Sequence, residues 1–107
     1  MLEVAQKYPH VKFFMGHSLY GDWEYARRVV KETPENVWLE LTAIPGERGI
    51  IEMLVEKVGS ERILYGTDMP WFDEFQGIGG VLSAKITEDD MRNILYRNAE
   101  RIFGKNW

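Results

Sequence analysis

The sequence predicts an α/β fold in which the strands run parallel. Three short apolar runs begin at residues 11, 37 and 62, and segments with apolar residues at helical spacing lie between and after them. Strands that alternate with helices in this way pair in parallel through right-handed crossovers. The chain has 107 residues, which is enough for one small domain, and we expect that domain to span residues 1–107.

The composition is that of an ordinary globular protein and argues against several functional classes. Hydrophobic residues make up 45% of the chain and charged residues 28%. A net charge of −4 without a long basic run disfavours nucleic acid and anionic membranes as partners. No apolar run reaches the roughly 18 residues of a membrane span, and the amino terminus does not resemble a signal peptide. The absence of cysteine excludes thiolate metal sites and agrees with a cytoplasmic location, which we expect.

The first half of the chain predicts a helix end, a strand, a helix and a second strand. Residues 1–8 have the character of a helix end, stopped by Pro9, which suggests that a preceding segment is missing. Residues 11–16 form a nearly continuous apolar run, as expected for a strand covered on both faces. Asp22 is expected to cap the following helix, and residues 37–42 to form the second strand.

The second half predicts two further helices around a third strand. Apolar residues recur on one helical face within residues 50–58, and the third strand is expected over residues 62–67. The glycine-rich residues 72–85 predict a short helix or a lid-like loop. The last helix is the clearest: it begins at a sequence that resembles a capping box, at residues 87–90, and ends at Gly104.

A histidine and an aspartate terminate the first and third predicted strands. Pro70 cannot donate to a sheet, so the third strand should end near Asp68, and His17 follows the first strand. Residues two apart in a strand share a face, so His17 should point as Met15 does, and Asp68 as Gly66 does. Chemistry in parallel α/β folds gathers at the carboxyl ends of the strands. An imidazole and a carboxylate that converge there could bind a divalent metal or activate a water.

Each of these side chains also has a purely structural interpretation. A histidine after a strand often bonds its own loop, and an aspartate before Met-Pro often caps a turn. Trp71 either walls a substrate pocket or packs in the core. Glu40 is an acid within an apolar strand and needs a partner, so it either lines the site or pairs with a nearby Arg or Lys. We expect His10 at the surface and Asn98 to tie a loop by hydrogen bonds.

Four runs carry a family resemblance: Tyr-Pro-His-Val-Lys-Phe…Gly-His at 8–17, Asn-Val-Trp-Leu-Glu at 36–40, Gly-Ser-Glu-Arg-Ile-Leu-Tyr-Gly-Thr-Asp-Met-Pro-Trp at 59–71, and Asn-Ala-Glu-Arg-Ile-Phe-Gly at 98–104. They resemble the amidohydrolase-2 family, metal-dependent hydrolases and decarboxylases on a (β/α)₈ barrel. The resemblance covers nearly the whole chain but only the family's last three βα units. It therefore implies a partial (β/α)₈ TIM barrel, with about three carboxyl-terminal βα units and a parallel sheet.

The resemblance also implies roles for single residues. His17 looks like the histidine at the end of the sixth strand, which ligates a metal or orients and polarises substrate and water. Asp68 looks like the aspartate that ends the eighth strand, a metal ligand that also shuttles the proton of the attacking water. The implied cofactor is a divalent metal, most often Zn²⁺, and the implied partner is a small-molecule substrate. The family's first-strand His-x-His pair and fifth-strand histidine have no counterpart, because the chain has only two histidines.

Three functions remain as alternatives. The chain is the carboxyl-terminal part of a metal-dependent hydrolase acting on an amide, ester or lactone, part of a decarboxylase of the same family, or a non-catalytic remnant. A catalytic zinc site takes three protein ligands and a complete barrel about 250 residues. We therefore expect a fragment that is completed by self-association or by the missing amino-terminal half. A nucleotide-binding module is disfavoured, since no glycine-rich phosphate loop follows a strand.

Overall fold

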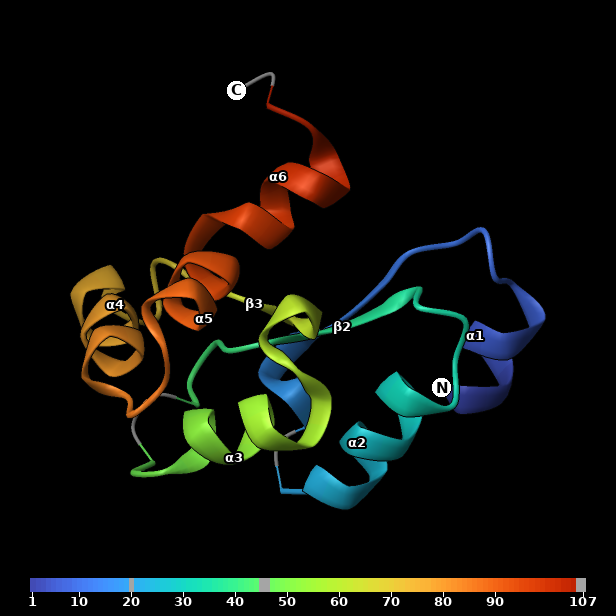
Figure 1. Cartoon of the computed structure of the whole chain (residues 1–107), viewed down its shortest axis with the longest axis horizontal. Coiled ribbons are helices and arrows are strands. Elements are labelled where there is room, and N and C mark those ends of the chain that lie inside the picture. Colours follow the sequence, from blue (N-terminus) through green and yellow to red (C-terminus); the bar gives the residue numbers. More distant parts are fainter. Residues whose placement is uncertain (20, 45–46, 106–107) are drawn as a thin grey trace.

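The computed structural model describes residues 1–19, 21–44 and 47–105, which form a parallel sheet with helices around it (Figure 1). The strands are β1 (Phe13–Met15), β2 (Val37–Glu40) and β3 (Ile63–Leu64). The α-helices are α1 (Leu2–Lys7), α2 (Trp23–Lys31), α3 (Ile50–Val58), α4 (Glu74–Ser83), α5 (Glu88–Arg92) and α6 (Asn98–Phe103). The remaining helical turns are η1 (Gly16–Leu19), η2 (Ser60–Arg62) and η3 (Asn93–Arg97).

The sheet has the strand order β1-β2-β3, and both pairings are parallel. Phe13 lies opposite Val37, and Leu39 lies opposite Ile63. This arrangement confirms the predicted parallel α/β fold. The strands are shorter than the sequence predicted, because β1 ends at Met15 and β3 spans only two residues.

Helices α2 and α3 cover one face of the sheet, and Figure 1 shows them side by side along it. The side chains on that face are buried, among them Met15, Leu39 and Ile63. Asp22 caps α2 as predicted, because its carboxylate accepts a hydrogen bond from the backbone N–H of Tyr25 at 3.0 Å. This face holds the hydrophobic core that fixes the positions of the three strands.

The other face of the sheet is only partly covered. Alternation along the strands places Phe14, Trp38 and Glu40 on it. The ring of Phe14 stacks on that of Trp38, with centroids 5.7 Å apart, and also contacts the ring of Phe103 at 5.4 Å. Phe14 is nevertheless 41% exposed and Phe103 60% exposed. We call the surface formed by Phe14, Trp38 and Phe103 the open face.

Helices α5 and α6 form one continuous helix through the π-helical turn η3. Its start is the predicted capping box: the Thr87 hydroxyl accepts from the backbone N–H of Asp90, whose side chain accepts from the backbone N–H of Thr87. At the π turn, the backbone N–H of Asn98 donates to the carbonyl of Asn93 rather than to that of Ile94. The carbonyl of Ile94 is therefore left available for another donor.

The last helix uses this turn to hold β3. The backbone N–H of Tyr65, just beyond the strand, donates to the carbonyl of Ile94 at 3.0 Å. The amide of Asn98 donates to the carbonyls of Ser60 and Ile63, both at 2.7 Å, and Asn98 is 1% exposed. The prediction that Asn98 ties a loop by hydrogen bonds is confirmed.

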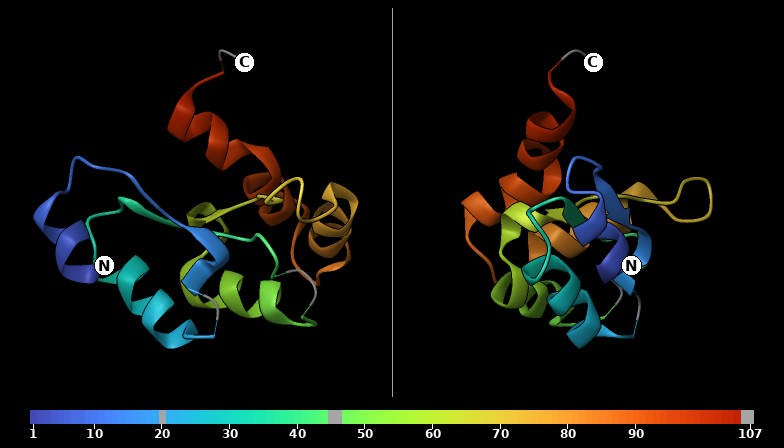
Figure 2. Two further views of the ribbon diagram at one scale, coloured as in Figure 1. Left: turned by 180° about the vertical axis from the view of Figure 1, so that it is seen from behind. Right: turned by 90° about the vertical axis from the view of Figure 1, so that its right-hand side faces the viewer.

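The glycine-rich segment forms helix α4, which packs against Tyr65. The Tyr65 hydroxyl donates to the carbonyl of Glu74 at 2.9 Å. The chain between β3 and α4 loops out from the body of the molecule, as the right-hand view of Figure 2 shows, and contains a cis peptide bond between Met69 and Pro70. Within the described part of the chain, none of the helices has the length and apolar character needed to span a bilayer.

Candidate functional site

The three strands end at one edge of the sheet, and each is followed by a residue with a left-handed backbone. The φ angles are 56° at His17, 64° at Ala43 and 55° at Asp68. Residues other than glycine rarely adopt this conformation, and those that do concentrate at functional sites, where the surrounding structure holds them in place. We therefore take this carboxyl edge of the sheet as the candidate site.

Glu40, the last residue of β2, contacts the ends of both neighbouring segments at this edge. Its Oε1 accepts hydrogen bonds from the backbone N–H of Thr42 at 2.8 Å and from the Thr42 hydroxyl. Its Oε2 accepts from the backbone N–H of His17 at 3.2 Å. Among the described residues no Arg or Lys forms an ion pair with Glu40, so the alternative of pairing with Arg or Lys is not met, and its role in lining the site stays a prediction.

Gly66 makes room for this carboxylate. A Cβ atom at position 66 would lie 1.8 Å from Oε1 of Glu40 and 3.0 Å from Oγ1 of Thr42. Any larger residue would push the carboxylate out of place. The carboxyl ends of all three strands therefore meet around the side chain of Glu40, an arrangement that the sequence signalled only as an acid within an apolar strand.

His17 lies on the surface at this edge. Its ring Nδ1 is 3.2 Å from the carbonyl oxygen of Thr42, and the hydroxyl of the buried Ser18 donates to the carbonyl of Glu40 at 2.7 Å. His17 is exposed whereas Met15 is 4% exposed, and strand alternation does not determine where the His17 side chain points. The strand ends at Met15, and the left-handed backbone that follows breaks the alternation.

Asp68 lies in the loop that follows β3, beyond the end of the strand. It is exposed, and its carbonyl accepts from the backbone N–H of Trp71 at 2.9 Å, which closes a turn. The strand was expected to continue to residue 67 but ends at Leu64, so strand alternation does not determine where the Asp68 side chain points. The structure places Asp68 and His17 at the same edge of the sheet, and we see no contact between them among the described residues.

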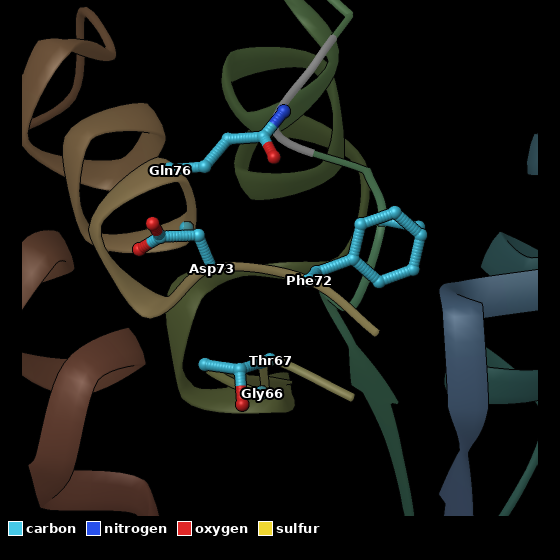
Figure 3. A pocket seen from close by; sticks show the side chains of 7 residues that line it. Gly66, Thr67, Phe72, Asp73 and Gln76 are labelled. Atoms are coloured by element: carbon cyan, nitrogen blue, oxygen red, sulfur yellow. The ribbon is translucent and has the colours of Figure 1, made fainter. Parts of the chain in front are cut away.

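Trp71 is 81% exposed, so the expectation of core packing is wrong. It lies on the projecting loop and lines a shallow surface groove with neighbours from the same segment, Met69, Phe72 and Phe75 among them. A small cavity of about 30 Å³ lies between this loop and the strand ends. Figure 3 shows Gly66 and Thr67 on one side of it and Asp73 and Gln76, at the start of α4, on the other.

The donor atoms at this edge suit part of a metal site. The imidazole of His17 and the carboxylate of Asp68 are of the types that Zn²⁺ binds, and both are exposed. Within the ranges that the structure describes, no group of three or more His, Cys, Asp or Glu side chains is arranged to hold a metal ion. Because a catalytic zinc takes three protein ligands, the described residues do not complete a site by themselves.

The fold and the strand-end site define a class: parallel α/β proteins that carry polar side chains at the carboxyl edge of the sheet. A family model, Amidohydro_2, described as amidohydrolase, matches residues 1–105, and the chain belongs to this family. Members of the family are metal-dependent. No curated protein sequence matches the chain.

Solved structures with a similar fold include two decarboxylases. One is 2,6-dihydroxybenzoate decarboxylase in complex with 2,6-dihydroxybenzoate (TM-score 0.74, 22% identity, covering 91% of this chain and 36% of that one). Another is the 5-carboxyvanillate decarboxylase LigW from Sphingomonas paucimobilis (TM-score 0.72, 18% identity, covering 95% and 36%). A Staphylococcus aureus protein provisionally named an amidohydrolase is also similar (TM-score 0.71, 18% identity, covering 92% and 36%). The chain thus spans about a third of the length of these proteins and matches a partial barrel.

Proposed function

We propose that this chain supplies the carboxyl-terminal part of the active site of a metal-dependent hydrolase that acts on a small amide, ester or lactone. The observation that carries the proposal is the placement of His17 and Asp68 directly after β1 and in the loop after β3, at one edge of the sheet. Membership of a metal-dependent family supports it, because chemistry on such barrels takes place at the carboxyl ends of the strands.

The two residues have complementary roles in this proposal. Asp68 accepts the proton of the attacking water, a role that a carboxylate exposed near the strand ends can take. His17 orients the substrate oxygen through its ring. A divalent metal, Zn²⁺ in our proposal, would polarise the substrate and lower the pKa of water when bound. Trp71, exposed on the same loop as Asp68, would contact the apolar part of the substrate.

The remaining metal ligands in this proposal come from outside the described residues. The solved structures of similar fold are nearly three times as long as the stretch that this chain matches. Either the amino-terminal part of a barrel or a second copy of this chain would bring the missing donors to the same edge. In both cases the open face and the strand ends of this chain become internal surfaces of a larger assembly.

A second candidate function is decarboxylation by the same site. It is favoured by the names of two solved structures of similar fold, which are decarboxylases of hydroxylated aromatic acids. In that reaction the site would hold an aromatic carboxylate, and carbon dioxide would be released. An assay that follows carbon dioxide release and acid release from the same candidate substrates separates the two reactions.

A zinc titration of the 107-residue chain tests the role of Asp68. We expect Asp68→Asn to weaken zinc binding by more than roughly 100-fold, because loss of a direct ligand should exceed the effect of losing an outer partner. Asp89→Asn is the matched control, since Asp89 lies on α5 and pairs with Arg97 at 2.9 Å, away from the strand ends. Isothermal calorimetry gives affinity and stoichiometry for each protein.

The outcomes of the titration distinguish a site that is rebuilt by association of copies from a site that needs the rest of a barrel. Stoichiometric binding at micromolar affinity or better, lost only in Asp68→Asn, supports a site that is rebuilt when copies of the chain associate. If the chain alone binds no zinc, the same two variants are compared by activity in a protein that contains the complete barrel. Retention of activity by Asp68→Asn in that protein would show that the assignment of Asp68 is wrong.

A further inference from the structure

Glu40 has no part in the proposed reaction, yet it is the most connected side chain at the strand ends. It is half-buried, and its two oxygens accept hydrogen bonds from the backbone N–H of His17, the backbone N–H of Thr42 and the Thr42 hydroxyl. All of these groups donate, and the oxygens of the Glu40 side chain accept from them. The position of the Glu40 side chain among the three strand ends therefore suggests that it has a role in the site.

The contacts of His17 show what Glu40 holds in place. The ring Nδ1 of His17 lies 3.2 Å from the carbonyl oxygen of Thr42. A carbonyl oxygen only accepts hydrogen bonds, so Nδ1 must carry the hydrogen for this contact to be favourable. In the neutral ring, Nε2 then carries the lone pair and is the nitrogen able to ligate a metal or accept a proton.

The same carboxylate fixes both partners of this contact. Oε1 of Glu40 binds the N–H and the hydroxyl of Thr42, whose own carbonyl faces the imidazole, and Oε2 binds the backbone N–H of His17. His17 has a left-handed backbone, an uncommon conformation that requires support from its surroundings. Glu40 thus links the peptide that carries the imidazole with the peptide that carries its acceptor.

We propose that Glu40 is a positioning residue that, through Thr42 and the backbone of His17, holds the His17 ring as its Nδ1–H tautomer and leaves Nε2 free at the carboxyl edge of the sheet. The role of these hydrogen bonds in catalysis rests on the proposed function. The tautomer itself is a property of the chain without metal or substrate. Failure of the proposed function and failure of this proposal are therefore distinguishable.

Nitrogen-15 NMR of the two imidazole rings tests the proposal in the metal-free chain. The spectrum is recorded near pH 9, well above the usual histidine pKa of about 6.5, so that both rings are neutral. We expect the ratio of Nδ1–H to Nε2–H at His17 to exceed that of an unconstrained ring roughly five-fold, the effect of one net hydrogen bond. His10 is exposed and serves as the internal reference for an unconstrained ring.

One variant replaces the carboxylate of Glu40, and a second variant displaces it. Glu40→Gln keeps the size of the side chain but presents an N–H₂ group to donors, and Gly66→Ala places a Cβ where Oε1 lies. In both, we expect the His17 ring to lose its preference and approach the tautomer mixture of His10. The matched controls are Glu56→Gln, at an exposed glutamate on α3, and Gly79→Ala, where a Cβ meets open space.

A wild-type His17 ring in the Nε2–H form overturns the proposal without any variant. An unchanged His17 tautomer in a folded Glu40→Gln protein also overturns it. If Glu40→Gln does not fold, Gly66→Ala decides in its place, because there the displaced atoms are the flexible end of a side chain rather than backbone. Retention of activity by Asp68→Asn in the complete barrel, together with the Nδ1–H tautomer at His17, contradicts the proposed function and leaves this inference standing.

Discussion

At Gly66 and Gly77, both within the described part of the chain, a neighbouring side chain occupies the space that a Cβ atom would take. Gly66 lies beside Glu40, and Gly77 lies beside Tyr65. A Cβ atom at position 77 would lie 2.9 Å from Cε2 and 3.2 Å from the hydroxyl oxygen of Tyr65. The absence of a side chain at Gly77 therefore allows α4 to approach the end of β3 closely.

We expect Gly77→Ala to lower the free energy of unfolding by about 1–3 kcal/mol, the usual cost of overpacking. Gly79 lies in the same helix but faces open space, so Gly79→Ala should raise the free energy of unfolding by up to about 1 kcal/mol through helix propensity. Urea denaturation followed by circular dichroism measures both. Equal effects of the two substitutions would contradict the close approach of α4 to Tyr65.

The hydrogen-bonded start of the last helix makes stability depend on pH. Asp90 accepts from the Thr87 hydroxyl at 2.6 Å and from the Thr87 backbone N–H at 3.1 Å. The hydroxyl of Ser60 and these Thr87 groups hold the pKa of Asp90 below its ordinary value of 3.8. Because the folded pKa lies below the unfolded one, the ionised carboxylate stabilises the fold above that ordinary value. This contribution is lost as the pH falls through the folded pKa.

Asp90→Asn should therefore destabilise the protein at pH 7 and make little difference below the folded pKa of Asp90. The measurement is the free energy of unfolding of wild type and variant across the acidic range, starting from neutral pH. Thr87→Ser is the matched control, because it keeps the hydroxyl and should keep the pH dependence. A difference between wild type and Asp90→Asn that is independent of pH would show that the carboxylate charge does not contribute.

Strand order and helix caps were predictable from the sequence where short-range patterns determine them. The parallel order of the sheet, the Asp22 cap and the capping box at residues 87–90 all follow from short-range patterns, and the structure confirms them. The π turn at η3 was not predictable, because apolar spacing continues through it and the hydrogen bond from Tyr65 to the Ile94 carbonyl joins distant segments. Strand ends were overestimated for a similar reason: apolar residues continue past the last paired residue.

The candidate site was predictable only in part. His17 and Asp68 were identifiable as polar residues after apolar runs, and their functional roles stay predictions. The role of Glu40 had two alternatives in the sequence, and its partners are a hydroxyl and two backbone groups that no charge pattern reveals. The fit between Gly66 and the Glu40 carboxylate was hidden for the same reason, since it joins residues from two strands.

At the scale of the whole molecule, the sheet exposes apolar surface and strand edges. Phe14 and Phe103 remain accessible on the open face, and β1 and β3 are the edge strands. Apolar patches and unpaired edges favour association with another chain. These edges suit pairing with further strands, and the chain matches about a third of the length of the similar solved structures.

We expect the 107-residue chain to self-associate in a concentration-dependent way, and the double variant Phe14→Ser/Phe103→Ser to shift the equilibrium toward monomer. Burial of the open face would remove both rings from water, whereas serine removes that driving force. Phe75→Ser is the control, since Phe75 is 75% exposed but lies on α4, away from the open face. Sedimentation velocity over a range of concentrations measures the outcome, and a compact wild-type monomer throughout would contradict the expectation.

The left-handed backbone at the strand ends also affects how related sequences should be compared. Histidine and aspartate are among the few residues other than glycine that tolerate this conformation, so conservation at positions 17 and 68 can reflect backbone shape as well as chemistry. Asparagine tolerates the same conformation but lacks the imidazole or the carboxylate. Homologues with asparagine at either position would therefore preserve the backbone turn and lose the reactive group. Such homologues distinguish selection for backbone shape from selection for chemistry.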